Sequence, residues 1–557
     1  MIHTTIRPSV SPQTITKVTR LFNGTIEDIL NELLQNSRRA NASWIGIVHE
    51  TTELGTTVTV SDNGSGIADP AQMLALGDSG WGVEIAATED PAGMGVFSLA
   101  GKETAIISRS AGSPKGWTAS IPADGWTGDQ DIAVREVDVE IGTTIRFFMP
   151  GLTGQCAARI IKDVCKFYPL PVIANGCEVP REDFLAKAIH VAHWNGSWIG
   201  VFEGHQYHAD PTVNFHGLLL KRKLAGVSET LGGKHYHARL DIGATPDLAL
   251  VLPARKEFVE NEGLTALLAA ARRTIFEAIA AKETHRLSFD DWKEARDLGV
   301  EMGEAEAVLP VWHPRVAEQD QLKVDYKEKT CDGHAIRVDD FEPDIGQAVG
   351  RALRHNMCRH ALVESHDEYA GYAWYDRLHR LGNVRFYIDK GEARHIVAEN
   401  GSFPSLGDHI EADRIELRYC IYHQPTQCEK EYTCEADVAF SVNEDGWYSG
   451  VDQIRIALVP NDTLTPEVLA DLIEDVCFCA SDDSDADSWE TQHEHFMRDA
   501  RELAADVLLG ADEAIASRVR DTIAGILWVL PKDRNVTITV DPARAIAVTL
   551  SPAGQQE

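Results

Sequence analysis

Residues 26–40 constrain the fold of this chain more than any other segment. Their apolar side chains recur at the i, i+3, i+4, i+7 and i+8 positions that line one face of an α-helix: Ile26, Ile29, Leu30, Leu33 and Leu34. Thr25, with Asp28 three positions later, matches the capping pattern that starts such a helix. A helix with one apolar face needs a second layer to cover that face. The sequence therefore predicts a layered domain that begins near residue 25.

The segments after this helix supply strands for the second layer. Residues 43–50 and 56–61 flank a turn that contains glycine, which predicts a hairpin. Further strands are expected at residues 104–109, 117–121, 132–137 and 143–149, and a helix at residues 157–167, with residues 170–179 closing the domain. The expected fold class is α+β, an α/β sandwich with helices on one face of a mixed, mostly antiparallel sheet.

The length of the chain, 557 residues, exceeds what one hydrophobic core usually serves. We expect a first domain at residues 1–185. A second, transducer-like αβ domain is expected at residues 186–300, with strand-like segments at 212–220 and 248–252 and a helix at 263–283. Residues 301–557 are expected to be a mixed α/β region of unknown function, without internal repeats.

Charge and cysteine usage narrow the function classes. The chain has 52 Lys and Arg against 86 Asp and Glu, and 52 minus 86 gives a net charge of -34. Such a charge repels phosphate backbones, which disfavours nucleic acid as a partner. The ten cysteines are scattered, as in a reducing compartment. Since no export signal and no apolar run of membrane-spanning length occur, we expect a soluble, cytoplasmic protein with no membrane partner.

The first helix also carries a polar stripe. Glu32, Asn36 and Arg39 lie at i, i+4 and i+7, so all three project from one side of the helix. An amide oxygen is a hard ligand suited to Mg²⁺, and a carboxylate one turn earlier can orient or deprotonate a water molecule. By itself, such a stripe is equally consistent with a solvated helix face.

The segment that follows the strand at residues 56–61 is rich in glycine. Asp62 is placed to accept a hydrogen bond from an exocyclic amine such as that of adenine, while Gly64 and Gly66 let the backbone approach a ligand closely. The same residues are also typical of a plain turn.

Two more segments have a composition that suits a nucleotide. Gly93 and Gly95 precede a short apolar run, and glycines that open a helix can present amide groups to phosphate, with Ser98 packing or donating behind them. Thr143 begins the strand at residues 143–149, where a hydroxyl group would complete the polar contacts of an adenine ring. Each pattern alone is common in proteins.

Taken together, the segments ELLQN, DNGSGI, GMGVFS and GTTIRF occur in the order of the four boxes of the GHKL superfamily. This superfamily includes DNA gyrase B subunits, ninety-kilodalton heat-shock chaperones, histidine kinases and MutL proteins. The chain resembles it over about residues 20–180. The resemblance implies a Bergerat-fold domain at residues 1–185 that binds ATP and Mg²⁺ and hydrolyses ATP.

The resemblance also implies a role for each matching residue. Glu32 corresponds to the general base and Asn36 to the Mg²⁺ ligand. Asp62 resembles the aspartate that reads adenine. The remaining matches are the glycines of the adenine loop, the glycines and serine near the phosphates, and the adenine-side hydroxyl: Gly64 and Gly66, Gly93 and Gly95 with Ser98, and Thr143.

Two features indicate which branches of the superfamily the chain resembles. Chaperone and MutL members usually have Asp where this chain has Arg39, which could meet a phosphate, a carboxylate such as Glu84 or Glu89, or a surface partner. Histidine kinases carry a dimerising histidine helix before this domain, whereas only His3 precedes the first helix here. The resemblance therefore favours the branches that hydrolyse ATP.

Relatives of the gyrase, MutL and chaperone type supply a cation to the γ-phosphate from the second domain. In this chain the segment LPARKEF lies between the strand-like residues 248–252 and the helix at 263–283, so Arg255 and Lys256 are the candidates. Such a cation would stabilise charge on the transferred phosphate. Two solvated cations at a helix start are the structural alternative.

Two further patterns are compatible with metal binding. Cys420, His423, Cys428 and Cys434 combine thiolate and imidazole groups suited to Zn²⁺, although cysteines in a strand are often buried apolar residues. Residues 483–494 match acidic positions of a calcium loop, with Asp483 first and Glu494 last, but Ser488 occupies the position that requires glycine. The sequence leaves both sites open.

We expect an ATPase whose nucleotide cycle closes a lid at residues 77–95, drives homodimerisation and acts on an unknown protein client. One alternative is a nucleotide-gated binding or signalling module with negligible turnover. Another is MutL-like DNA handling, which the net charge disfavours.

Overall fold

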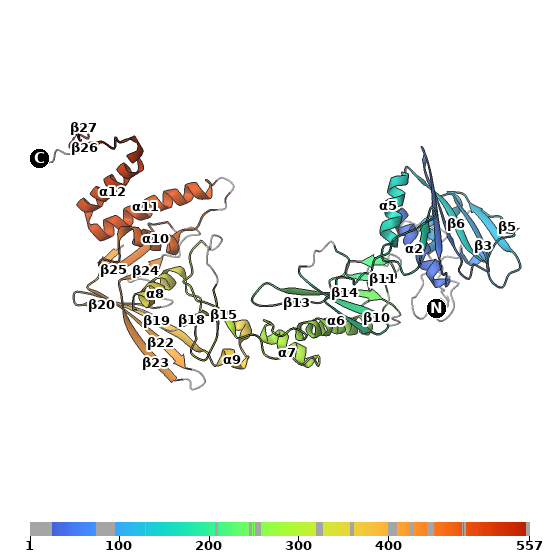
Figure 1. Ribbon diagram of the computed structural model, residues 1–557, viewed down its shortest axis with the longest axis horizontal. Coiled ribbons are helices and arrows are strands. Elements are labelled where there is room, and N and C mark those ends of the chain that lie inside the picture. The colour runs from blue at the N-terminus through green and yellow to red at the C-terminus, as the bar shows by residue number, and fades with distance from the viewer. Residues whose placement is uncertain are drawn as a thin grey trace, which may run out of the picture. The chain divides into compact units, whose positions relative to one another are not determined.

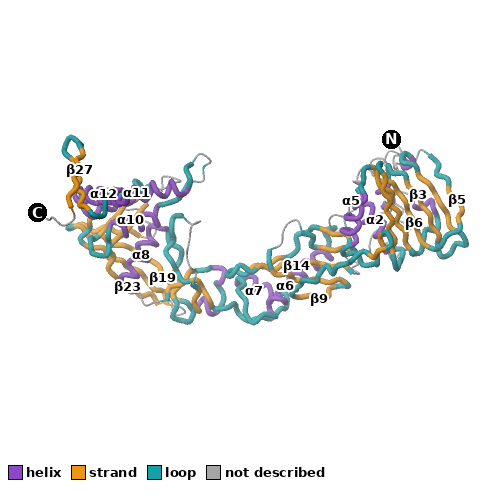
Figure 2. Tube along the Cα trace, turned by 45° about the horizontal axis from the view of Figure 1, so that its top comes forward, coloured by secondary structure: helices purple, strands orange, loops and turns teal. Residues whose placement is uncertain are grey.

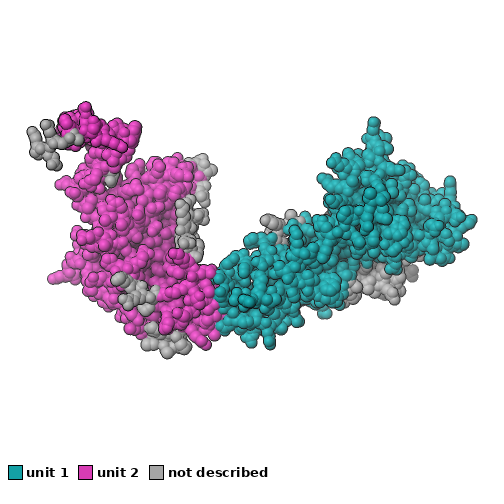
Figure 3. Space-filling view, viewed as in Figure 1, with its two compact units in different colours: residues 1–306 teal, residues 307–557 magenta. Residues whose placement is uncertain are grey.

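The computed structural model describes residues 25–73, 95–127, 130–205, 210–243, 248, 250, 258–318, 327–356, 361–398, 409–423, 428–442, 450–481, 483 and 486–552. The chain divides into two compact units, Met1–Glu306 and Ala307–Glu557, which Figure 3 distinguishes by colour. Each unit is described by itself.

Helix α2 (Ile26–Arg39) opens the described part of unit 1. Its N-cap is Thr25, whose side chain accepts a hydrogen bond from the backbone N–H of Asp28, as the capping pattern predicts. The five apolar residues that predicted the helix are all buried. The predicted helix is confirmed, and its buried face includes three polar residues that the apolar pattern does not reveal: Gln35, Ser37 and Arg39.

An eight-stranded sheet forms the second layer, in the order β5-β4-β3-β6-β2-β1-β7-β8. All neighbouring strands are antiparallel except β1 and β7. The sheet is therefore mostly antiparallel, as expected. Its strands are β1 (Ile45–Thr52), β2 (Gly55–Asp62), β3 (Thr104–Arg109), β4 (Gly116–Ile121), β5 (Val134–Val137), β6 (Gly142–Pro150), β7 (Val172–Ala174) and β8 (Cys177–Glu178).

Helices α2 and α5 (Gly154–Cys165) lie on the same face of this sheet (Figures 1 and 2). The strand register puts alternate residues of β2 and β6 on that face, where Val58 lies opposite Phe147 and Val60 opposite Ile145. These four residues form one buried cluster with the apolar residues of α2. The short elements of this part are α3 (Pro70–Met73), η1 (Gly95–Leu99) and η2 (Gly125–Thr127).

A second sheet, in the order β12-β11-β14-β10-β9 with β13 beside β14, follows in unit 1. The single strand expected at residues 212–220 is wrong: His216 and Gly217 adopt positive φ angles of 53° and 98° and form a turn between two strands. The elements are β9 (His190–Trp194), β10 (Ser197–Glu203), β11 (Val213–Phe215), β12 (Leu218–Leu220), β13 (Gly226–Ser228), β14 (His235–Ile242), α6 (Glu262–Ala280) and α7 (Phe289–Asp297).

Part of the strand expected at residues 248–252 lies outside the described residues. Of that segment, Leu250 forms an isolated bridge with Phe258. The expected helix at 263–283 corresponds to α6, which packs on β10 and β14 and shares a buried core with them.

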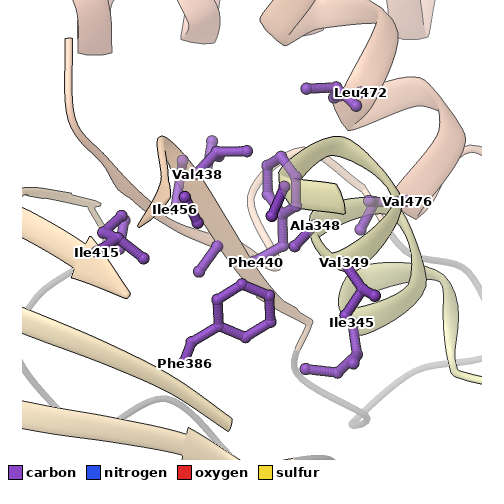
Figure 4. Packing of buried hydrophobic residues seen from close by; sticks show 14 of the residues in the cluster. Ile345, Ala348, Val349, Phe386, Ile415, Val438, Phe440, Ile456, Leu472 and Val476 are labelled. Carbon is purple, nitrogen blue, oxygen red and sulfur yellow. The ribbon is translucent and has the colours of Figure 1, made fainter. Parts of the chain in front are cut away.

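Unit 2 contains a six-stranded sheet and a three-stranded sheet around one core. In Figure 4, Ile345 and Val349 of α8 lie near Phe386 of β19 and Phe440 of β24. The elements are β15 (Val308–Pro310), β16 (Glu328–Thr330), β17 (Ile336–Val338), α8 (Pro343–His355), β18 (Leu362–Glu364), η4 (Asp367–Tyr369), α9 (Ala373–Asp376), β19 (His379–Lys390), β20 (Ala393–Ala398), β21 (His409–Glu411), β22 (Arg414–His423), β23 (Cys428–Ala436), β24 (Val438–Val442), β25 (Ile454–Leu458), α10 (Pro466–Cys477), α11 (Trp489–Leu509), α12 (Ala511–Gly525), η5 (Leu527–Val529), β26 (Arg534–Val540) and β27 (Ile546–Pro552).

The possible zinc site is not formed. In the antiparallel pair β22 and β23, Cys434 lies opposite Leu417, which is three residues from Cys420. An odd separation along a strand places residues on opposite faces, so Cys420 and Cys434 point away from each other. Among the described residues, no group of three or more His, Cys, Asp or Glu is arranged to hold a metal ion.

The possible calcium loop lies partly outside the described residues, because Asp485 is not among them. Ser488 is the N-cap of α11 and accepts a hydrogen bond from the backbone N–H of Thr491. Glu494, which would be the last ligand of such a loop, therefore lies inside α11. Within the described residues, no helix is long and apolar enough to cross a membrane.

A buried ion pair joins helix α8 to the start of β24 in unit 2. Arg351 donates from Nε and Nη2 to the two carboxylate oxygens of Asp437 at 2.9 and 2.6 Å, and the side chains are 16% and 9% exposed. Burial acts to raise the pKa of Asp437. The hydrogen bonds from Arg351 and Asn461 together outweigh this effect, so the pKa lies below its ordinary value.

We expect Arg351→Ala to lower the free energy of unfolding of the chain by about 3–5 kcal/mol at neutral pH, because Asp437 would be left buried without its cation. Urea denaturation measures the change. Arg394→Ala is the matched control: Arg394 binds Asp389 with similar geometry, but on the surface, so little change is expected.

The effect of Arg351→Ala should also depend on pH. A depressed carboxyl pKa stabilises the folded chain above the ordinary pKa, and this contribution is lost as the pH falls through the depressed value. The difference between wild type and Arg351→Ala should therefore shrink in acid. A difference that is independent of pH would contradict the pairing.

Candidate functional site

The candidate site lies where the C-terminal end of α2 meets the ends of β2 and β6. Asp62 is the last residue of β2, and Thr143 of β6 lies directly opposite it in the antiparallel register. Residues at such positions have side chains on the same face of the sheet. The register therefore brings together two residues that are 81 positions apart in the sequence.

The carboxylate of Asp62 is held by two donors from different elements. Ser37 on α2 donates to Oδ2 at 3.0 Å, and the backbone N–H of Gly64 donates to Oδ1 at 2.9 Å. Burial raises the pKa of Asp62, while these hydrogen bonds and a backbone hydrogen bond from Thr143 act to lower it. This carboxylate thus links the helix, the strand and the glycine loop.

A second polar contact continues the site into β3. Ser108 lies next to Thr143 across the β3–β6 pair, and their hydroxyl oxygens are 3.0 Å apart. Ser108 also accepts a hydrogen bond from the backbone N–H of Ile67 at 2.9 Å and donates to the carbonyl of Gly142. The strand order β3-β6-β2 therefore lines up Ser108, Thr143 and Asp62.

The loop after Asp62 packs so closely that two of its positions require glycine. Gly66 has a φ angle of +69°, and a Cβ atom there would lie 2.0 Å from the carbonyl oxygen of Arg109. At Gly64 a Cβ atom would lie 2.6 Å from that of Ala40. Both predicted glycines lie beside Asp62, and their role in the structure is close backbone packing against β3 and the end of α2.

The polar stripe of α2 is only partly solvated. Glu32 and Asn36 are partly buried, and one carboxylate oxygen of Glu32 is shielded from solvent. Arg39 is 4% exposed and donates from Nη1 to Oδ1 of Asn36 at 3.3 Å. Arg39 is therefore not a surface residue, and its side chain contacts the predicted metal ligand.

The third box is described only from Gly95 onward. Gly95 starts the five-residue 3-10 helix η1, rather than a longer α-helix, and η1 packs against α2. Ser98 is 1% exposed, and its hydroxyl has no hydrogen-bond partner among the described residues. Its observed role is packing. Gly93, the predicted lid, Glu84 and Glu89 lie outside the described residues.

The predicted cations of the second domain, Arg255 and Lys256, also lie outside the described residues. A different contact joins the two parts of unit 1. Gln35 of α2 donates through Nε2 to the carbonyl oxygen of His216 at 2.9 Å, in the turn between β11 and β12. Helix α2, which carries part of the candidate site, is therefore hydrogen-bonded to the second sheet at this turn.

Sequence patterns alone missed three of the residues that build the site. Ser37 and Gln35 lie between the motif positions of α2, and Ser108 lies in a strand with no motif of its own. Ser37 and Gln35 could have been found as polar residues on the predicted buried face of the helix, since such residues need hydrogen-bond partners. Ser108 becomes visible only when the strand order is known.

No protein-family model matches the sequence, and no curated protein does. Among solved structures, the chain is similar to the ATPase domain of Aquifex aeolicus MutL complexed with ADP, with 16% identity and a TM-score of 0.24 over 36% of this chain and 84% of that one. It is also similar to the N-terminal domain of a DNA repair protein, with 16% identity and a TM-score of 0.24 over 38% of this chain and 80% of that one.

These TM-scores are too low to support an argument about the fold or the activity.

We expect Gly66→Ala to lower the free energy of unfolding by more than about 2 kcal/mol, because the added methyl group meets backbone at a positive φ angle. Gly112→Ala is the control, since a Cβ atom at Gly112 has no neighbour within 4 Å. Urea denaturation compares the two variants. Equal stability of Gly66→Ala and wild type would mean that the loop adopts a different conformation in solution.

Proposed function

We propose that residues 1–185 bind ATP with Mg²⁺ and hydrolyse it. The observation that carries the proposal is the contact between the motif segments: Ser37, which directly follows the first box, donates to Asp62 of the second, and Asp62 lies opposite Thr143 of the fourth. Three weak sequence motifs that meet at one place are much less expected by chance than the same motifs merely in series.

The hydrogen bonds of Asp62 leave a lone pair that could accept a hydrogen bond from adenine. The two oxygens of the carboxylate have four lone pairs, and the donors Ser37, Gly64 and the backbone of Thr143 use three of them. A further donor with the geometry of the adenine amino group can therefore be accepted without displacing Ser37 or Gly64. The hydroxyl of Thr143, on the adjacent strand, supplies the second polar group that an adenine ring needs.

The stripe of α2 supplies groups for the phosphates. The oxygen of Asn36 accepts from Arg39 through one lone pair, so a second lone pair is left for Mg²⁺. When bound, Mg²⁺ neutralises phosphate charge and orients the terminal phosphate. Arg39 adds a positive charge next to Asn36, at the position where related proteins have Asp.

Glu32 lies one turn before Asn36 and is the group that we assign to the attacking water. Its carboxylate would hold the water in line with the terminal phosphate and accept its proton. The lid at residues 77–95, a cation at Arg255 or Lys256, nucleotide-driven homodimerisation and an unknown protein client complete the proposed cycle. DNA handling of the MutL kind remains disfavoured by the net charge of -34.

Asp62→Asn should weaken ATP binding on the order of 10- to 100-fold, because the amide presents an NH₂ group to one of the donors that the carboxylate accepts. Isothermal titration calorimetry with ATP and Mg²⁺ measures the affinity. Asp69→Asn is the control, because Asp69 is exposed and, within the described residues, its Oδ1 accepts only from the backbone N–H of Ala71. Unchanged affinity in Asp62→Asn would remove Asp62 from the binding site.

Glu32→Ala should bind ATP normally but hydrolyse it about 10²- to 10⁴-fold more slowly, because only the water loses its partner. Single-turnover hydrolysis at saturating ATP gives the rate. Glu27→Ala is the matched control on the same helix, since Glu27 is exposed in the first turn.

The Glu32→Ala result also separates the two classes of function. A near-wild-type rate in this variant would eliminate Glu32 as the general base while leaving the binding site intact. If the wild-type chain binds ATP but shows no turnover, the alternative of a nucleotide-gated binding or signalling module is favoured instead.

A further inference from the structure

A turn of the second sheet is packed against the C-terminal half of α2. Gln35 donates through Nε2 to the carbonyl oxygens of His216 at 2.9 Å and of Phe215 at 3.4 Å, and its side chain is buried. Strand β11, which leads into this turn, therefore lies beside α2 (Figure 1). The helix that carries Glu32 and Asn36 is thus bound to a turn that lies 181 residues further along the chain.

Hydrogen bonds within the second sheet fix the shape of this turn. Asn214 accepts from the backbone N–H of Gly217 at 2.8 Å, which closes the turn, and donates from Nδ2 to Oδ1 of Asp241 on β14 at 2.8 Å. The same Nδ2 donates to the carbonyl oxygen of Phe167, in the segment after α5, at 3.2 Å. The two carbonyl groups that Gln35 binds are therefore held in place from the second sheet.

Tyr168 links the same three segments a second time. Its hydroxyl group donates to the carbonyl oxygen of Leu34 at 2.6 Å, one residue before Gln35 in α2. Its ring lies against the turn, because a Cβ atom at Gly217, where φ is +98°, would lie 2.8 Å from Cδ2 of Tyr168. Only glycine fits at such a position. Helix α2, the segment after α5 and the turn therefore form one continuous contact.

This contact lies next to the proposed catalytic groups on α2. Gln35 is three positions after Glu32, so their side chains are neighbours on the helix surface, and it directly precedes Asn36. A helix with its side chains has a radius of about 5–6 Å, so a rotation of about 10° about its axis moves the end of a side chain by about 1 Å. A misplacement of about 1 Å can lower a reaction rate on the order of 100-fold.

Gln35 and Ser37 constrain this rotation from two sides. Two positions correspond to about 200° around the helix axis, so the two side chains leave α2 in nearly opposite directions. Ser37 binds Asp62 in the first sheet, and Gln35 binds the turn of the second sheet. Apolar contacts are non-directional, whereas hydrogen bonds are directional. One directional contact would let the helix pivot about it, and the second removes this freedom.

We propose that Gln35 is a positioning residue of the candidate site: through its hydrogen bonds to the turn, the second sheet holds Asn36 and Glu32 in the geometry that Mg²⁺ and water require. The inference rests on the proposed function, but the contact reaches no phosphate and differs in this from the cation expected from the second domain. Because coupling between two sites is reciprocal, ATP with Mg²⁺ should in turn stabilise the turn.

Gln35→Met tests the proposal, because Met has a similar volume but cannot donate to the carbonyl groups. ATP hydrolysis is measured as a function of Mg²⁺ concentration. Turnover at saturating ATP should fall about 10- to 100-fold. The Mg²⁺ concentration for half-maximal turnover should rise at least about 5-fold, the lower bound of typical coupling. The affinity for ADP without Mg²⁺ should stay within about twofold, because the adenine contact at Asp62 is retained.

Gln347→Met is the matched control. Gln347 of α8 is as buried as Gln35, and its Nε2 also donates to a backbone carbonyl, that of Arg315, at 3.0 Å, but it lies in unit 2. This variant should lose stability to urea as Gln35→Met does, while turnover and Mg²⁺ dependence stay as in the wild type. The comparison separates a positioning role from a purely structural one.

Asn214→Leu disturbs the turn without changing α2. It should raise the Mg²⁺ requirement in the same direction as Gln35→Met, and the double variant should be no more impaired than the more impaired single variant, because both act through one contact. Additive losses would mean that the turn and Gln35 act independently, which overturns the proposal.

The outcomes separate this inference from the proposed function. A wild type that hydrolyses ATP, together with a Gln35→Met variant of unchanged turnover and Mg²⁺ dependence, overturns the positioning role alone. A wild type without turnover overturns both. If the variants do not fold, hydrogen exchange of the wild type decides: ATP with Mg²⁺ should slow the exchange of residues 213–220. Unchanged exchange in that segment overturns the proposal.

Discussion

The carboxylate of Asp62 is the group on which the arrangement of the N-terminal site depends. It accepts from Ser37 on the helix layer and from Gly64 on the loop, and it ends a central strand of the sheet. Burial makes its charge costly, so the donors around it are needed to keep the carboxylate in place. The same requirement fixes how α2 lies on the sheet, because only one rotation of the helix points Ser37 at Asp62.

The surroundings of Asp62 follow from this contact. With α2 fixed, Ala40 lies so near the loop that position 64 has no room for a side chain. Gln35 then reaches the turn at His216 in the second sheet. The helix that carries Glu32 and Asn36 is therefore held at both its sheet face and its C-terminal end. Rigid support of this kind is what a site needs to position reacting groups.

Several expectations from the sequence were correct for a physical reason. The apolar spacing and cap of α2 depend only on local contacts, so its limits could be predicted to within one residue. The strands of the first sheet were located by the same local patterns. The sequence left open what distant residues decide. Whether Cys420 and Cys434 share a face of the sheet depends on strand register, which no spacing rule contains.

The sequence by itself determined the first helix and the strands of the first sheet, the order of the four motif segments and the net charge, because each of these depends on residue type and local spacing. Only the tertiary structure decided which polar residues meet. Strand order placed Ser108 beside Thr143, and burial turned Arg39 inward. Such pairings join residues through space, so they depend on the packing of whole layers and not on any single segment.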